Sequence, residues 1–208
     1  MPERPVIDVR PAAPAEAEAI ARIHSEALPA DFLPSLGRDF LARVHYPATF
    51  ASPYGVNLVA VSAESTPIGF VTVAHDAARF SGDVMRRGLL SIAWYVLRAT
   101  LRDPRHLRLS AEVLWSVLTG RPDPVNGEIF LIAVDRAWQG KGAGQALVRA
   151  SLAYLSEHGV DRCRTKTLAS NDHVIRMYER LGWAVRDRFS LIGRSYVTIV
   201  SPVLVRPT

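Results

Sequence analysis

Cysteine and lysine are nearly absent from this sequence of 208 residues. Cys163 is the single cysteine, which excludes an intramolecular disulfide and a cysteine-based metal site. Such usage is typical of a reducing compartment, so we expect a cytoplasmic protein. Only Lys141 and Lys166 are lysines, and arginine therefore supplies almost all of the positive charge.

Long apolar runs are missing as well. Residues 1–10 read MPERPVIDVR, with charges and prolines where a signal peptide needs an apolar core. The most apolar stretch, residues 88–97, lies between Arg87 and Arg98. A membrane-spanning helix needs about 18 apolar residues in a row, and this stretch is much shorter. We therefore expect no membrane span.

Apolar residues are nevertheless plentiful, at 49% of the chain, which is enough for a continuous core. The length fits a single domain over residues 1–208. Residues 79–121 contain eight arginines and three acidic residues. That surplus of five equals the net charge of +5 of the whole chain, so the excess charge lies in one segment.

Apolar periodicity predicts an α/β fold. The expected strands cover residues 6–10, 56–63, 68–75, 128–134, 162–168, 183–189 and 195–204. The expected helices cover residues 14–27, 36–45 (ending before Pro47), a segment that ends at about His158, and 174–181. Residues 76–126 interrupt this pattern with amphipathic stretches near 83–102 and 107–119, which predict a helical insertion.

A glycine-rich turn follows the buried strand 128–134. Glycines at 140, 142 and 144 allow the backbone N–H groups to form one concavity, and the start of a helix adds unpaired donors and a positive dipole end. Together these features favour binding of a pyrophosphate. A Walker loop is excluded because Gly142 follows Lys141, and Gln145 stands where a dinucleotide fingerprint needs glycine. A turn without a ligand is the alternative.

The pattern Gln139-x-x-Gly142-x-Gly144 resembles the acetyl-CoA signature of the Gcn5-related N-acetyltransferase (GNAT) family. The resemblance is strongest over residues 128–183, and Arg136 departs from it where many relatives carry proline. It implies a mixed, mostly antiparallel sheet with flanking helices, splayed near Val134, with the insertion between the third and fourth strands. It also implies acetyl-CoA as cosubstrate, without a metal. The residues it assigns to acetyl-CoA are the backbone of Ile132, Ala133 and Val134 for the pantetheine arm, and Gln139, Gly140, Lys141, Gly142, Ala143, Gly144 and Gln145 for the pyrophosphate.

A second segment carries the same resemblance. Asn171, Tyr178 and Gly182-Trp183 match the family's Asn…Tyr-x-x-x-Gly-Phe pattern, with tryptophan in place of phenylalanine. By the resemblance, the Tyr178 hydroxyl faces the acyl sulfur as general acid, and Asn171 contacts the coenzyme arm. An aromatic core residue on an amphipathic helix is the alternative for Tyr178.

Glu128 is the candidate base, because it resembles the glutamate that histone-acetylating relatives place at the head of this strand. A strand period would put Glu128, Phe130 and Ile132 on one face, with the carboxylate in the mouth of the site. A solvated acid at a strand end is the alternative, and many relatives use another base or ordered water.

Three further residues have weaker functional interpretations. His75 could assist a proton transfer, although a packing or surface role is the simpler expectation, and His173 reads as a polar residue of a first helical turn. Cys163 could carry an acyl group, but it lies between Arg162 and Arg164 without a base partner. We therefore expect direct transfer in a ternary complex.

The insertion is the natural source of an acceptor pocket. Its arginines, beside Trp94, Tyr95 and Trp115, could bind an anionic acceptor or lie on an anionic membrane. A helical cover with a solvated basic face or a homodimer contact is the alternative, and nucleic-acid binding is disfavoured because no recognised module accompanies the charge. The sequence thus predicts an N-acetyltransferase that acts on a primary amine of a small molecule, and the basic insertion favours an anionic acceptor. The competing hypotheses are a non-catalytic acyl-CoA sensor or scaffold, a protein or peptide N-acetyltransferase, and a nucleotide oxidoreductase, which Gln145 disfavours.

Overall fold

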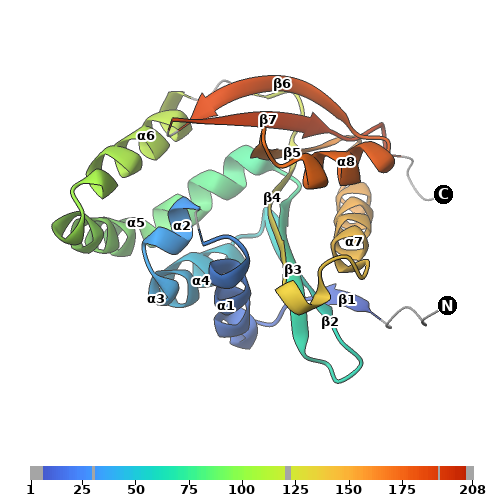
Figure 1. Cartoon of the computed structure of the whole chain (residues 1–208), viewed down its shortest axis with the longest axis horizontal. Helices are drawn as coiled ribbons and strands as arrows, with labels where there is room; N and C mark the ends of the chain where they lie inside the picture. The colour runs from blue at the N-terminus through green and yellow to red at the C-terminus, as the bar shows by residue number, and fades with distance from the viewer. Residues whose placement is uncertain (1–6, 30, 120–122, 192, 205–208) are drawn as a thin grey trace.

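Seven strands form one sheet in the computed structural model, which describes residues 7–29, 31–119, 123–191 and 193–204, and of residues 113–119 the backbone only. The strand order is β1-β2-β3-β4-β5-β7-β6, and β4 with β5 is the parallel pair among antiparallel ones. The mixed, mostly antiparallel sheet is therefore confirmed (Figure 1). The strands are β1 Asp8–Pro11, β2 Gly55–Val61, β3 Pro67–Ala74, β4 Gly127–Val134, β5 Cys163–Leu168, β6 Ala184–Leu191 and β7 Arg194–Val200.

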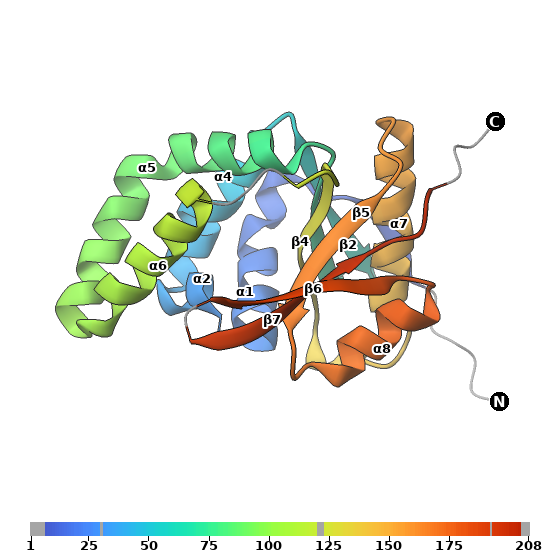
Figure 2. The ribbon, with the colours of Figure 1, turned by 90° about the horizontal axis from the view of Figure 1, so that it is seen from above.

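Helices cover both faces of the sheet. The helices α1 to α6 lie on one side, and α7 lies on the other (Figure 2). The α8 helix packs with α7 in the same apolar cluster. The helical segments are the 3-10 turn η1 Pro14–Glu16, α1 Ala17–Ala27, α2 Phe32–Ser35, α3 Arg38–Phe40, the π turn η2 Leu41–His45, α4 Tyr46–Phe50, α5 Ala77–Arg102, α6 Arg105–Thr119, the 3-10 turn η3 Arg136–Trp138, α7 Ala143–Glu157 and α8 Asp172–Arg180.

Each face of the sheet has its own core. Val71, Val73 and Ile129 pack against α7 and α8, whereas Phe70 and Ala133 pack against α1, α3 and η2. This division follows from strand geometry, because successive side chains of a strand point to opposite faces. We refer below to the α7 face and the α1 face.

The predicted helical insertion is confirmed, and its first helix begins six residues earlier than expected. The α5 helix begins at Ala77, directly after β3, because the Asp76 carboxylate accepts a hydrogen bond from the Arg79 N–H (3.0 Å) and caps the first turn. The α6 helix then returns toward β6, so the insertion lies on the α1 face.

The predicted end of the second helix was wrong. Helical structure runs through Pro47, which lies in the first turn of α4. Proline clashes with the carbonyl four residues earlier in a regular helix. Here the preceding turn, residues 41–45, is a π turn, and its wider spacing relieves that clash. The predicted first strand began at Val6, which lies outside the described residues.

Candidate active site

An opening in the sheet lies between β4 and β5. The two strands pair only at Gly127 with Cys163, Glu128 with Arg164, and Ile129 with Thr165. Beyond Ile129, β4 keeps β3 on one side and has no strand partner on the other among the described residues, and β5 turns away from it (Figure 1). The last shared pair therefore marks the vertex of a gap, where the family resemblance expects the pantetheine arm.

A β-bulge on β4 lies next to this vertex. Thr72 pairs with Leu131 and Val73 with Ile129, which leaves Phe130 as an extra residue. The ring of Phe130 lies 5.2 Å from that of Phe80 on α5.

The bulge corrects one prediction about β4. It shifts the side-chain alternation by one residue, so Glu128 shares the α1 face with Ala133 while Ile132 points to the α7 face. The predicted shared face for Glu128, Phe130 and Ile132 was therefore wrong for Ile132.

The backbone of β4 presents polar groups to the gap. The N–H of Asp135 donates to the carbonyl oxygen of Ile68 (2.8 Å), which fixes the hydrogen-bond alternation with β3. Ala133 consequently directs its N–H and C=O toward β3, whereas Ile132 and Val134 direct theirs into the gap. The side-chain amide of Gln139 donates to the Val134 carbonyl oxygen (3.1 Å) and holds the start of the glycine loop against the strand.

The glycine loop leaves a row of N–H donors without acceptors. Gly140 (φ +75°) and Gly142 (φ +98°) adopt the left-handed conformation that glycine favours, and a Cβ at either position would meet nothing within 4 Å. The first N–H of α7 with an acceptor is that of Ala146, which donates to Gly142 (3.0 Å). Within the described residues, the N–H groups from Gly142 to Gln145 have none, so they are available to an anion.

Charged and polar side chains border this loop. The Lys141 ammonium lies 5.1 Å from the centre of the Trp138 ring. Asp135 accepts from the N–H of Ala137 (3.1 Å) and pairs with Arg22 of α1 (3.2 Å). The start of the loop is thus held by Asp135, and the open space at Gly140 and Gly142 leaves room for a ligand.

Tyr178 lies behind the vertex, on the α7 face. Its side chain is 1% exposed and packs against the Trp183 ring at 4.7 Å. Its hydroxyl neighbours Thr165, but Thr165 donates its proton to the Ile129 carbonyl oxygen (3.0 Å). The phenol oxygen makes no hydrogen bond of its own within the described part of the chain. Burial raises the pKa of Tyr178 well above its usual value, so this hydroxyl keeps its proton.

Asn171 is placed at the start of α8, two turns before Tyr178. Its backbone carbonyl accepts from the Ile175 N–H (3.0 Å), and its side-chain amide lies 3.4 Å from the Thr167 hydroxyl of β5. The side chain therefore faces the strand that borders the gap.

Glu128 is buried on the α1 face, 4% exposed, and both of its oxygens are ion-paired. Arg164 contacts one oxygen at 2.6 Å, and Lys166 contacts the other at 3.1 Å. Asp123 joins the same network through Arg164 (2.7 Å) and through Arg186. The solvated strand-end acid of the alternative interpretation is therefore not observed.

This network was missed at the sequence level. Its signal was the alternation of Arg164 and Lys166 on a strand with buried neighbours, which indicates a carboxylate partner across the sheet.

The remaining candidates either lie apart from the gap or are buried in a way that opposes reaction. Cys163 is fully buried, and burial raises the pKa of its thiol far above its usual range, which opposes a thiolate nucleophile. His75 is hydrogen-bonded to the Tyr154 hydroxyl (2.9 Å) near the C-terminal end of α7 and stacks on His158. His173 is exposed in the first turn of α8.

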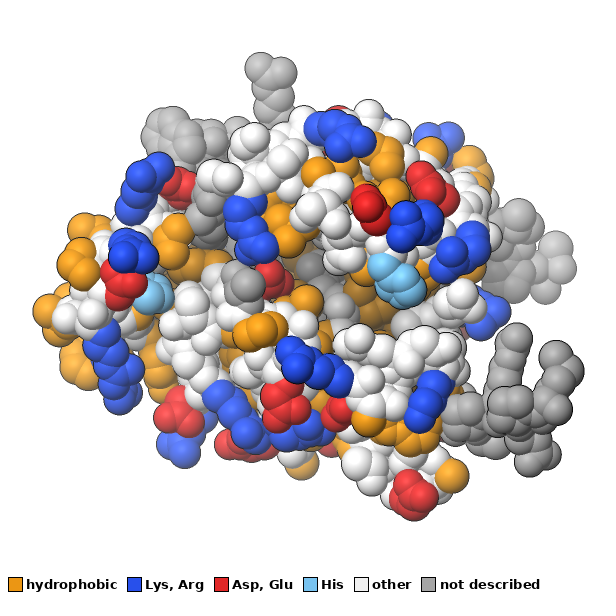
Figure 3. Space-filling model, viewed as in Figure 1, with side chains coloured by type: hydrophobic (Ala, Val, Ile, Leu, Met, Phe, Trp, Pro, Cys, Tyr) orange, Lys and Arg blue, Asp and Glu red, His pale blue; other side chains and the backbone are white. Residues whose placement is uncertain are grey.

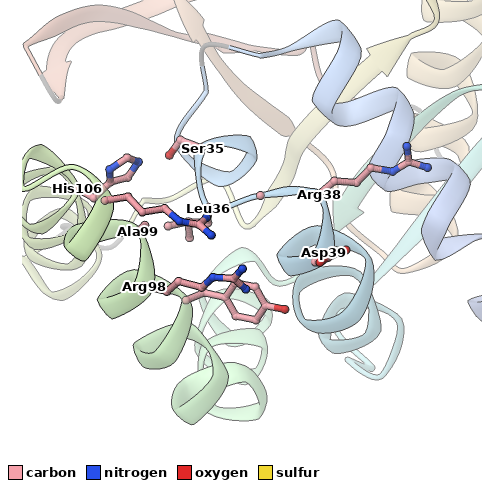
Figure 4. A pocket seen from close by; sticks show the side chains of 10 residues that line it. Ser35, Leu36, Arg38, Asp39, Arg98, Ala99 and His106 are labelled. Carbon is pink, nitrogen blue, oxygen red and sulfur yellow. The ribbon is translucent and has the colours of Figure 1, made fainter.

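A basic pocket of about 340 Å³ lies between the α2–α3 segment and the α5–α6 hairpin (Figure 4). Its polar lining comprises Ser35, Arg38, Asp39, Arg98, Arg102 and His106. Arg98 and Arg102 have no acidic partner among the described side chains. Tyr95 lines this pocket, whereas its neighbour Trp94 is exposed on another side of α5. The side chain of Trp115 lies outside the described part of the chain.

Comparisons with known proteins agree with this architecture. A sequence model described as the acetyltransferase (GNAT) family matches residues 17–183. In the crystal structure of the ribosomal-protein-S18-alanine N-acetyltransferase from Escherichia coli, 97% of each chain superposes with a TM-score of 0.60 at 13% sequence identity. That likeness concerns the fold.

Curated relatives match over shorter stretches. A mycothiol acetyltransferase from Mycobacteroides abscessus is 33% identical over 100 residues, which are 45% of this chain and 34% of the relative. Another, from Propionibacterium freudenreichii subsp. shermanii, is 38% identical over 66 residues, or 32% of this chain and 20% of the relative. The chain therefore matches only about a fifth to a third of the length of these relatives.

Proposed function

This chain belongs to the acetyltransferase (GNAT) family, and we propose that it is an acyl-CoA-dependent acetyltransferase that acetylates the primary amine of a small molecule. Acetyl-CoA, the family's cosubstrate, supplies the activated acyl thioester. Transfer is direct, within a ternary complex, and uses Glu128 as proton acceptor and Tyr178 as proton donor.

One observation carries this proposal: the two groups lie on opposite faces of the sheet at the vertex of one gap. Glu128 is on the α1 face and Tyr178 on the α7 face, and they flank the last β4–β5 pair, Ile129 with Thr165. An amine that enters from the α1 face loses its proton toward Glu128, directly or through water. The departing sulfur gains a proton from the Tyr178 hydroxyl on the far side.

The pairing of Glu128 shapes its role. Arg164 and Lys166 hold the carboxylate in place. A carboxylate has about four lone-pair positions, so it can still accept a hydrogen bond from the amine or from water. The Tyr178 hydroxyl complements it, because no acceptor among the described residues holds its proton.

The glycine loop supports the binding half of the proposal. We assign the backbone N–H groups from Gly142 to Gln145 to the pyrophosphate, and those of Ile132 and Val134 to the pantetheine arm and the acyl carbonyl. Gln139 supports this arrangement by holding the loop through the Val134 carbonyl.

Two matched glycines test the cofactor assignment. Gly142 and Gly159 bracket α7, both have positive φ (+98° and +73°), and neither leaves a Cβ in contact with other atoms. Alanine at either site therefore imposes similar backbone strain, of about 1 kcal/mol. We expect Gly142→Ala to lower the affinity for CoA about tenfold, measured by calorimetry, and Gly159→Ala to leave it unchanged. Equal affinities would refute a loop-bound pyrophosphate.

A small-molecule acceptor is supported by two observations. The curated relatives are named mycothiol acetyltransferases, although they match over short stretches. The pocket beside the α1 face contains Arg98 and Arg102, which have no acidic partner among the described side chains, and this favours an acceptor with an anionic group.

The catalytic proposal is tested by following thiol release from acetyl-CoA across a panel of amines that includes glucosamine, glucosamine 6-phosphate and short peptides. We expect turnover with a small amine, a lower KM for the phosphorylated sugar, and loss of that preference in Arg98→Gln. Turnover restricted to peptides would overturn the small-molecule proposal. CoA binding without turnover on any amine would favour a sensor.

Direct transfer has its own test at the single cysteine. We expect Cys163→Ala to keep its turnover, and no acetyl group on Cys163 by mass spectrometry after incubation with acetyl-CoA alone. An acetylated Cys163 that transfers its group to amine would refute the direct step.

A further inference from the structure

The α5–α6 hairpin carries most of the exposed apolar surface that the structure describes. Among the described residues, every exposed large hydrophobic side chain except Val203 belongs to this hairpin. The hairpin side chains are 51% to 86% exposed. They are Leu89, Leu90, Trp94, Leu97, Leu101 and Leu107. A gathered apolar patch of this kind marks an interaction surface, whereas scattered single residues would not.

Four of these side chains form a continuous stripe along α5. Leu90, Trp94, Leu97 and Leu101 follow a spacing of four, three and four residues, which places them on one face of the helix. The opposite face packs into the α1-face core, where Ala99 is buried. The apolar stripe therefore points away from the body of the protein, and hydrophobic side chains gather at this end of the molecule (Figure 3).

Arginines border the apolar stripe. Arg86, Arg87, Arg98 and Arg102 on α5, and Arg105 and Arg108 on α6, are exposed. Arg86 and Arg87 share the single carboxylate of Asp83, and Arg98 and Arg102 have no acidic partner within the described residues. The surface thus combines leucine and tryptophan in the centre with a surplus of cations on its flanks.

The combination of a central apolar stripe and flanking arginines favours one partner over another. A second copy packed by two-fold symmetry would bring the same arginines against each other, and like charges repel. An anionic phospholipid surface has the complementary charge and an interfacial layer that accepts leucine and tryptophan. No helix in the described part of the chain is long and apolar enough to cross a membrane, so such contact would lie along the surface.

We propose that the α5–α6 hairpin docks on an anionic lipid surface, with the apolar stripe in the headgroup layer and the flanking arginines on lipid phosphates. This surface is separate from the β4–β5 gap, but it shares Arg98 and Arg102 with the pocket proposed for the acceptor. The lipid proposal is therefore tested at Leu90 and Leu101, which do not line that pocket.

Flotation with vesicles tests it directly. We expect the protein to float with vesicles of equal parts phosphatidylcholine and phosphatidylglycerol, and not with phosphatidylcholine alone. Binding should weaken as salt is raised, because the arginine contribution is screened. The double variant Leu90→Ser/Leu101→Ser should lower the partition coefficient about tenfold or more, since two exposed leucines no longer enter the interface.

A matched control separates the apolar stripe from general hydrophobicity. Val203 is 56% exposed and adjoins Leu204, which packs in the α7-face core and donates its N–H to the Asp161 carbonyl oxygen (2.7 Å). The hairpin lies on the α1 face, so Val203→Ser should leave flotation unchanged. Thermal stabilisation by CoA, retained in all variants, shows that they fold.

Three results would overturn the proposal. The first is no flotation with the anionic vesicles, and the second is unchanged flotation of Leu90→Ser/Leu101→Ser. The third is a lipid-free dimer, seen by light scattering, that this double variant converts to a monomer, because a second copy would then be the occupant.

Discussion

Replacing Tyr178 with phenylalanine separates a catalytic hydroxyl from an aromatic core residue. The substitution removes one oxygen and keeps the ring that packs against Trp183 at 4.7 Å. That oxygen is fully buried and has no hydrogen-bond partner among the described residues.

Stability and catalysis are expected to respond in opposite directions. A buried hydroxyl without a partner costs about 1–3 kcal/mol, so its removal should leave Tm unchanged or raise it by a few degrees. A positioned general acid contributes about 10²–10⁴ in rate, which is about 3–5 kcal/mol of barrier. We therefore expect Tyr178→Phe to lower kcat by at least about 10² with no loss of stability.

The pH dependence adds a second readout. Burial raises the pKa of Tyr178, so the wild-type acid stays protonated throughout the neutral and mildly alkaline range. Thiol release by wild type should therefore show no falling limb from this group up to about pH 10, its ordinary pKa.

The assay compares kcat, CoA affinity and Tm for wild type and Tyr178→Phe on whichever amine gives turnover. An unchanged kcat would refute the acid role. A drop in kcat accompanied by an equal loss of folded protein would show that the hydroxyl is structural.

Further predictions concern the opposite face of the sheet and the core. Glu128→Gln should lower kcat/KM for the amine by about 10²–10⁴, and raising the pH should restore part of the rate by supplying free amine. The control is Glu157→Gln, which changes an exposed acid on α7. A normal rate for Glu128→Gln at neutral pH would exclude the base role. His24 is fully buried on α1, with its Nδ1 2.7 Å from the Tyr46 hydroxyl, and burial lowers the pKa of His24 to about 3. Since the unfolded pKa is about 6.5, the unfolded state binds the extra proton, so stability is full above pH 6.5 and falls as the pH drops toward 3, by about 2 kcal/mol at pH 5. His24→Asn, which keeps a group near the Nδ1 position, should remove that part of the loss in denaturant titrations at pH 7 and 5, and an undiminished loss would show that other groups cause it.

Most secondary structure followed from local patterns. The α6 helix, the β2–β3 hairpin and the strand–loop–helix unit around the glycines are encoded by contiguous residues and were predicted close to their observed bounds. The α5 helix was also predicted, but it begins six residues before the predicted start at residue 83. The exception near Pro47 arose because a π turn, which depends on packing of residues 41–45 against α1 and α5, relieved the proline clash.

The glycine loop and the Asn171–Tyr178 segment were identifiable from sequence because their chemistry is local: backbone donors at a helix start, and two side chains two turns apart on one helix. The sequence did not show which groups face each other across the gap. The Phe130 bulge, set by the register with β3, moved Ile132 to the other face of the sheet from Glu128. The environment of Glu128 was set by Arg164 and Lys166, which a parallel pairing brings beside it from a distant part of the chain.

The sequence by itself thus determined the family, the cofactor loop and the candidate acid. Only the tertiary structure decided which face each group occupies and which charges surround the base, because strand register and long-range pairing depend on the packing of the whole sheet.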